Sequence, residues 1–142
     1  MKKASSPEGH PQGFDAGGHL YTDIYAIRLA ETYLLRAEAY LDKRDKVAAA
    51  ADINVLRDRA HATPVSPADV DIDYILDERA RELVVEEPRR LTLSRIGLLY
   101  DRVKKYNPVS APTIQPFNNL LPIPQNTIDV NSGATFSQNP GY

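Results

Sequence analysis

Apolar residues recur every three or four positions through the middle of the chain, which is the spacing of one face of an α-helix. The first such segment is expected to start at Thr22 or Asp23, either of which can cap a helix, and to end near Leu41. Aromatic rings in its apolar face more often pack against a neighbouring helix than serve as a platform for a sugar. The expected face comprises Tyr25, Leu29, Tyr33, Ala37 and Tyr40.

A short charged turn at residues 42–45 separates this segment from a second predicted helix over residues 46–60. The alanines of the second helix would let a neighbouring helix approach closely. Two helices joined by so short a polar loop form an antiparallel hairpin. The packing stripe of the second helix comprises Ala50, Ile53, Leu56 and Ala60.

A third helix is predicted over residues 72–86, after a breaker-rich connection in which Ser66 can cap a helix start. Pro88 cannot continue this helix, because its ring removes a hydrogen-bond donor and restricts the residue before it. A short helical stretch over residues 90–94 follows. The last predicted helix covers residues 98–105 and turns Leu99 and Val103 inward.

Charged residues fall on the apolar side of the third predicted helix. Ile72, Leu76 and Leu83 share one face, and Arg79 and Glu86 project within about 60° of its centre. A buried charge is costly unless it is paired or reaches water, so we expect an internal network of ion pairs. The candidate members are Arg79, Glu82, Glu86, Arg89 and Arg90.

Helical spacing disappears after residue 106, where residues 107–142 hold six of the eleven prolines. This segment has too many large apolar residues for a free tail, so we expect it to lie extended across the helices. The expected anchors are Phe117, Leu120, Leu121, Ile123 and Ile128. The predicted class is therefore all-α, with an irregular lead-in over residues 1–21, a helical domain over residues 22–106 and an extended segment over residues 107–142.

The composition is that of one globular domain, with 142 residues of which 42% are hydrophobic and 25% charged. A net charge of −2 favours neither nucleic acid nor anionic lipid as a partner. The absence of cysteine excludes disulfides, thiol nucleophiles and a lipid anchor on an N-terminal cysteine in this chain. No stretch approaches the ~18 apolar residues of a membrane helix, and the polar residues after Lys3 do not form a signal peptide.

An enzymatic site is the less favoured interpretation of the charged residues. Glu78, Glu82 and Glu86 step by four along one side of the third helix, a spacing found in carboxylate metal and acid/base sites. Neighbouring arginines favour ion pairs over a protonated general acid at these positions. The three histidines share no metal-ligand spacing, so no catalytic residue, metal or cofactor is expected.

Residues 33–56 fit one tetratricopeptide-like unit, in which two helices carry small and bulky residues at set positions. Arg44 departs from that pattern, because the turn between the helices usually holds glycine. Four motifs in order then resemble the SusD (RagB/SusD) family. They are RLAETYLLRAEAY at 28–40 with ADINVLRDRA at 51–60, ILDERAREL at 75–83 with RRLTL at 89–93 and RIG at 95–97, LPIPQ at 121–125, and QNPGY at 138–142.

The resemblance implies a glycan-capturing surface lipoprotein of the Bacteroidetes type of outer membrane, whose tetratricopeptide-like helices pack on a TonB-dependent, SusC-like porin. Only the C-terminal part of such a protein is matched, and the lipoprotein signal and acylated cysteine of the family are not found in this chain. The sugar-contacting residues of the family come largely from loops outside the match. No glycan-binding residue is therefore carried over.

Three hypotheses follow from the sequence. The leading one is the C-terminal part of a SusD-like glycan-binding protein without catalysis. The alternatives are a free-standing helical-repeat module that binds a protein, and a carboxylate-based glycoside hydrolase. Apolar faces that normally cover a neighbouring helix pair, with Tyr25, Leu29 and Tyr33 among their residues, also predict self-association of this chain.

Overall fold

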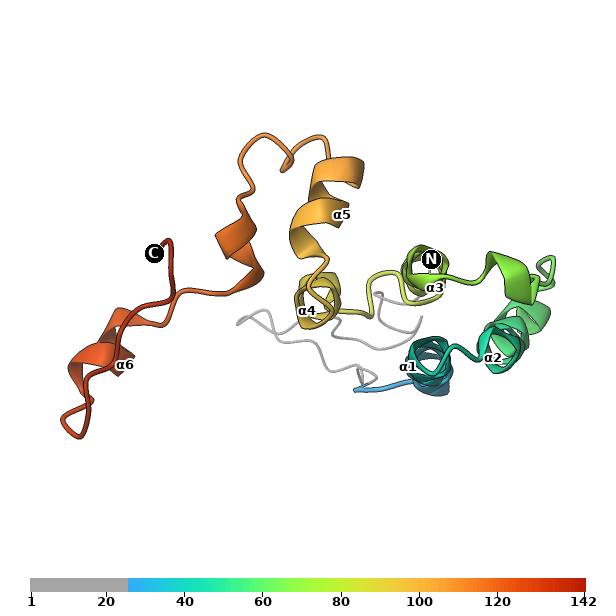
Figure 1. Cartoon of the computed structure of the whole chain (residues 1–142), viewed down its shortest axis with the longest axis horizontal. Coiled ribbons are helices and arrows are strands. Elements are labelled where there is room, and N and C mark those ends of the chain that lie inside the picture. The colour runs from blue at the N-terminus through green and yellow to red at the C-terminus, as the bar shows by residue number, and fades with distance from the viewer. Residues whose placement is uncertain (1–25) are drawn as a thin grey trace, which may run out of the picture. The chain divides into compact units, whose positions relative to one another are not determined.

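The computed structural model describes residues 26–142, and none of these residues forms a β-strand (Figure 1). The predicted all-α class is confirmed. The chain divides into a first unit that ends at Glu87 and a second unit, Pro88–Tyr142, and each is described by itself. The expected boundaries after residues 21 and 106 remain predictions.

In the first unit, α1 (Leu29–Asp42) and α2 (Lys46–Arg59) form the predicted tetratricopeptide-like hairpin. The turn between them falls within the predicted residues 42–45. The Asp45 side chain caps α2 by accepting a hydrogen bond from the Ala48 amide at 3.0 Å. Arg44 takes the left-handed conformation with φ 62°, which is why this turn position usually favours glycine.

The third helix, α3 (Ile72–Glu82), packs on α1 and α2, with the 3-10 helix η1 (Pro67–Asp69) in the connection before it. Ser66 caps η1 as predicted, and Asp71 caps α3. The alanines in the core bring the helices close together. The buried apolar side chains are Ala30, Leu34, Ala37, Ala49, Ala50, Ile53, Leu56, Val65, Val70, Ile75, Leu76 and Leu83.

The predicted start of the first helix is wrong, because residues 26–28 are not helical and α1 begins at Leu29. Thr22, Asp23 and Tyr25 lie outside the described residues. The predicted buried face is also rotated, since Leu29 is 70% exposed and the buried stripe runs through Leu34 instead. Helix α1 begins directly after Arg28, whose backbone is extended and whose side chain forms ion pairs with Glu82 and Glu86.

The predicted end of the third helix is wrong as well, because α3 stops at Glu82 and residues 83–87 form a turn. Within the turn, the amides of Glu86 and Glu87 both donate to the Leu83 carbonyl. Val85 takes a left-handed conformation with φ 70°, which is unfavourable for a β-branched residue. The turn places the carboxylates of Glu86 and Glu87 beside Arg28 and Arg79. These ion pairs form in place of a further turn of α3.

The second unit contains α4 (Arg89–Arg95), α5 (Leu99–Tyr106), the 3-10 helix η2 (Pro116–Asn119) and α6 (Gln125–Asp129). Helix α5 packs against α4 and η2, with Leu99 buried and Val103 half-buried. Leu99 and Val103 thus both lie on the inner side of α5, as the sequence predicts. Gly97, with φ 73°, forms the turn from α4 to α5.

The C-terminal segment of the second unit holds itself together through its own side chains. The Gln138 amide pairs with the Ile123 backbone, accepting from its nitrogen at 2.7 Å and donating to its oxygen at 2.9 Å. The Tyr142 ring stands edge-on against Phe117 at 5.2 Å, and its hydroxyl donates to the Leu120 carbonyl. Leu120 and Leu121 remain largely exposed, so their role as anchors on the helices stays a prediction.

Within residues 26–142, no helix has the length and apolar character needed to span a bilayer.

The strain at Val85 gives a testable prediction. Its side chain is 71% exposed, so Val85→Gly loses little packing and removes the penalty of a left-handed valine. The free energy of unfolding should rise by about 1 kcal/mol in urea denaturation. Val85→Ala is the matched control and should change stability by less than about 0.5 kcal/mol, because alanine keeps the Cβ. Equal gains from both variants would contradict the assignment of strain to this residue.

Candidate functional site

Arg79 is the central charged residue of the first unit. Its side chain is only 1% exposed, and it is the largest of the fully buried side chains among the described residues. The guanidinium donates from Nε to Glu87 at 2.6 Å, from Nη1 to Glu38 at 3.4 Å and from Nη2 to Glu31 at 3.4 Å. Glu31 and Glu38 belong to α1, whereas Glu87 ends the turn after α3. One cation therefore joins α1, α3 and the turn.

A second arginine completes this arrangement from the residue before α1. Arg28 pairs with Glu82 at 2.8 Å and with Glu86 at 2.5 Å, and it also donates to the Glu82 carbonyl. Burial by itself lowers the pKa of Arg28, but its hydrogen bonds to Glu86 and Glu82 outweigh this effect and hold the pKa above its ordinary value. Arg59, from the last turn of α2, also pairs with Glu82 at 2.7 Å.

We call these residues the inner ion-pair cluster. It contains three of the five predicted residues, Arg79, Glu82 and Glu86, together with five residues that the sequence did not single out. The members are Arg28, Glu31, Glu38, Arg59, Arg79, Glu82, Glu86 and Glu87. Arg79 takes its acidic partners from α1 and the turn, and Glu82 takes its cations from outside α3. One available signal was the seven-residue spacing of Glu31 and Glu38, which places both on one helix face.

The remaining predicted residues, Arg89 and Arg90, lie on α4 in the second unit. Arg90 donates from Nη2 to the Asn118 carbonyl at 2.8 Å and to the Leu120 carbonyl at 3.5 Å. Arg90 therefore contacts the C-terminal segment through hydrogen bonds to two backbone carbonyl groups. The idea that all five candidates form one network stays untested as a whole.

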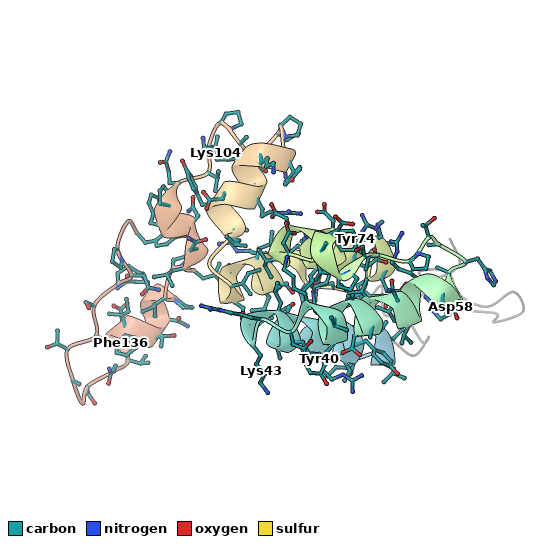
Figure 2. All side chains as sticks on the ribbon, turned by 45° about the vertical axis from the view of Figure 1, so that its right-hand side comes forward. Tyr40, Lys43, Asp58, Tyr74, Lys104 and Phe136 are labelled. Carbon is teal, nitrogen blue, oxygen red and sulfur yellow. The ribbon has the colours of Figure 1, made fainter. Side chains whose placement is uncertain are left out.

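Two smaller groups of ion pairs also join these helices. Glu78 accepts hydrogen bonds from Arg57 and Arg81, and both guanidinium groups lie within about 6 Å of the Tyr74 ring, labelled in Figure 2. Arg36 of α1 pairs bidentately with Asp52 of α2 at 2.6 and 2.7 Å. This hydrogen bonding raises the pKa of the Arg36 guanidinium above its ordinary value.

The three glutamates with four-residue spacing are therefore all occupied as ion-pair partners. Glu78 accepts from Arg57 and Arg81, Glu82 accepts from Arg28 and Arg59, and Glu86 accepts from Arg28. No group of three metal-ligating side chains occurs among the described residues. The geometry gives these carboxylates a structural role in joining the helices.

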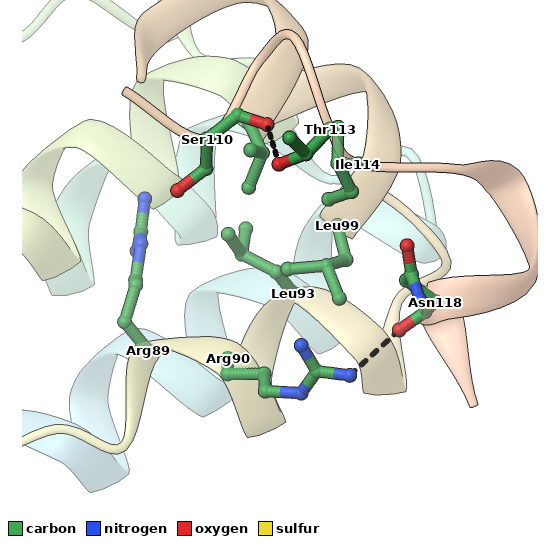
Figure 3. A pocket seen from close by; sticks show the side chains of 9 residues that line it. Arg89, Arg90, Leu93, Leu99, Ser110, Thr113, Ile114 and Asn118 are labelled. Carbon is green, nitrogen blue, oxygen red and sulfur yellow. Dashed lines mark hydrogen bonds between the residues drawn. The ribbon is translucent and has the colours of Figure 1, made fainter. Parts of the chain in front are cut away.

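A hollow of about 370 Å³ lies entirely within the second unit, between α4, α5 and the loop that precedes η2 (Figure 3). Its lining combines aliphatic side chains with two arginines and several polar groups. The residues are Arg89, Arg90, Leu93, Leu99, Val103, Ser110, Thr113, Ile114 and Asn118. A volume of this size is in the range of sites for small molecules.

Comparison with known proteins identifies the family. The model of the SusD family matches residues 1–142. The chain belongs to the SusD family. Its sequence is 38% identical over 127 residues to the starch-binding protein SusD of Bacteroides thetaiotaomicron, an alignment that covers 85% of this chain and 22% of the relative. It is 36% identical over 114 residues to SusD-like protein P25 of Formosa agariphila, which covers 74% of this chain and 22% of that relative.

This SusD-family chain thus spans about a fifth of the length of the curated relatives it matches. No solved structure matches it. The family membership confirms the resemblance inferred from the four sequence motifs. The inner ion-pair cluster and the hollow are accordingly features of a SusD-family segment.

The burial of Arg79 gives a prediction for stability. Arg79→Ala removes the cation shared by three carboxylates and should lower the free energy of unfolding by about 3–5 kcal/mol in urea denaturation. Arg59→Ala is the control, because its side chain is 61% exposed and Glu82 keeps Arg28 as a partner. That variant should lose less than about 1 kcal/mol. A similar small loss in both variants would mean that the Arg79 pairs contribute little.

Proposed function

We propose that this chain is the C-terminal part of a SusD-like glycan-binding protein, in which its helices act as scaffold and as a partner-binding surface. The observation that supports this proposal most directly is the family match over all 142 residues. The 38% identity to a protein named for starch binding points to carbohydrate as the ligand class of the parent protein.

Binding without catalysis is favoured by the state of the carboxylates. A glycosidase needs two carboxyl groups that flank the scissile bond, one of them able to give up a proton. Glu78 and Glu82 each accept hydrogen bonds from two guanidinium groups instead. Both are thereby committed to holding helices together, which leaves the hydrolase hypothesis without a supporting pair.

A TonB-dependent, SusC-like porin is the proposed protein partner, with the parent protein located at the cell surface as an outer-membrane lipoprotein. This part of the proposal rests on the family. It is compatible with exposed apolar side chains on the first unit, such as Ile27 and Leu29, which suit a protein-binding surface. The same exposure favours the second candidate, a protein-binding module, and the self-association expected from the sequence.

The test is purification of the parent protein through a C-terminal tag from detergent-extracted outer membranes of its own host. We expect a TonB-dependent porin to co-purify and the eluate to retard on polysaccharide gels without releasing reducing sugar. The variant Glu82→Gln should leave retardation unchanged, because this residue is assigned to structure. Hydrolysis that disappears in this variant would overturn the proposal in favour of a glycosidase. Co-purification without any polysaccharide retardation would favour the protein-binding module.

A further inference from the structure

Side chains close to the C-terminus satisfy the backbone of a loop in the second unit, residues 117–123. We call this set of contacts the C-terminal clasp. It joins the Gln138 amide to both backbone groups of Ile123, Asn139 Nδ2 to the Leu121 carbonyl at 2.7 Å, and the Tyr142 hydroxyl to the Leu120 carbonyl at 3.0 Å. In water these backbone groups would need no side-chain partners. The clasp therefore equips the loop for a contact from which water is excluded.

The clasp closes because residue 141 is glycine. Gly141 has φ 94° and lies against the Phe117 ring, so that an added Cβ would overlap the ring atoms. The same ring packs edge-on against Tyr142, with the two centroids 5.2 Å apart. Gly133 of the same unit is not packed in this way, since a Cβ there would meet Asn131 Oδ1 at 3.8 Å. Alanine at these two positions therefore distinguishes an effect on the clasp from an effect elsewhere in the segment.

An apolar patch on the clasped loop remains exposed. Its members are Phe117, Leu120, Leu121 and Tyr142, whose exposed fractions are 37%, 49%, 63% and 44%. The ring contact between Phe117 and Tyr142 and the hydrogen bond from Tyr142 to Leu120 place these residues side by side. Exposed apolar side chains that lie together mark an interaction surface. Because the clasp already orders the loop, less conformational entropy is lost when a partner binds.

The patch belongs to a segment with almost no charged side chains. From residue 106 to residue 142, the one charged side chain is that of Asp129, which accepts a hydrogen bond from Gln125 at 2.7 Å. The segment is rich in asparagine and glutamine instead. An amide both donates and accepts hydrogen bonds, and apolar groups pack on apolar groups, so such a surface is complementary to itself. A two-fold contact needs this property, because it places the same patch on both subunits.

We propose that this patch docks on the same patch of a second copy of the chain, and that the C-terminal clasp sets the geometry of the contact. Burial of the apolar side chains supplies the favourable free energy. The proposal places self-association in the second unit, whereas the sequence-based expectation places it on the first unit. It does not depend on the proposed glycan-binding function, so that either one can fail alone.

The test is sedimentation velocity of the full chain over a range of protein concentrations, where a monomer–dimer equilibrium is expected. Leu121→Asp should weaken dimerisation at least about tenfold, because it places like charges on both sides of the contact. Leu29→Asp is the matched control, since it adds the same charge at a leucine that is 70% exposed in the first unit. That variant should change the dimerisation constant less than about twofold.

The role of the clasp is tested by a second pair of variants. Gly141→Ala keeps all four side chains of the patch but should weaken dimerisation about tenfold, because the added Cβ opens the clasp. Gly133→Ala should leave dimerisation within about twofold of the unchanged protein. Equal dimerisation of the two variants would overturn the proposal.

Salt separates this contact from a charge-driven one. Residues 26–87 hold nine basic and fourteen acidic side chains, whereas Pro88–Tyr142 holds six and two, so that unlike units of two copies could attract each other. An apolar contact should be kept or strengthened as salt is raised, whereas dissociation would indicate such a head-to-tail contact and overturn the proposal. A monomer at every concentration, or dissociation by Leu29→Asp alone, would overturn it too. So would binding to phosphatidylcholine vesicles that Leu121→Asp abolishes, because the patch would then face lipid.

Discussion

The first unit depends on one buried guanidinium group, that of Arg79. Arg79 must find acidic partners inside the protein, because an unpaired charge at 1% exposure would cost more free energy than the apolar contacts around it supply. Its partners come from α1 and from the turn after α3. The packing of α3 on α1 is therefore specified by charge geometry as well as by the leucine and alanine core.

Ion pairs of Arg28 and Arg79 together explain both helix ends that sequence periodicity misplaces. Arg28 is held in an extended conformation by Glu82 and Glu86, so α1 starts only after it. The α3 helix stops at Glu82 because continuing would carry Glu86 and Glu87 away from their arginines. The left-handed conformation of Val85 is the local strain that accompanies this turn, and the ion pairs on either side hold it in place.

Much of the fold could be predicted from the sequence, because the hairpin, its turn and the helices α4 and α5 follow from apolar spacing and breakers. The short helices η2 and α6 were not predicted, since they form within residues 107–142, where helical spacing is absent. Arg79 could also be singled out, since it falls on an apolar helix face. Its partners could not, because Glu31 and Glu38 look like ordinary polar positions until α3 is placed against α1. The hollow escaped prediction for a similar reason: Arg90 and Ser110 are twenty residues apart and come together only through the loop after α5.

The ion-pair origin of the α3 terminus is tested most directly by a double-mutant cycle between Arg79 and Glu87, the shortest pair of the buried guanidinium. Arg79→Met, Glu87→Gln and the double variant would be compared by urea denaturation. A coupling free energy of about 2–3 kcal/mol is expected, because each single change leaves the other residue buried without its main partner. A coupling below about 0.5 kcal/mol would show that the two side chains act independently, and the ion-pair origin of the α3 terminus would then be wrong.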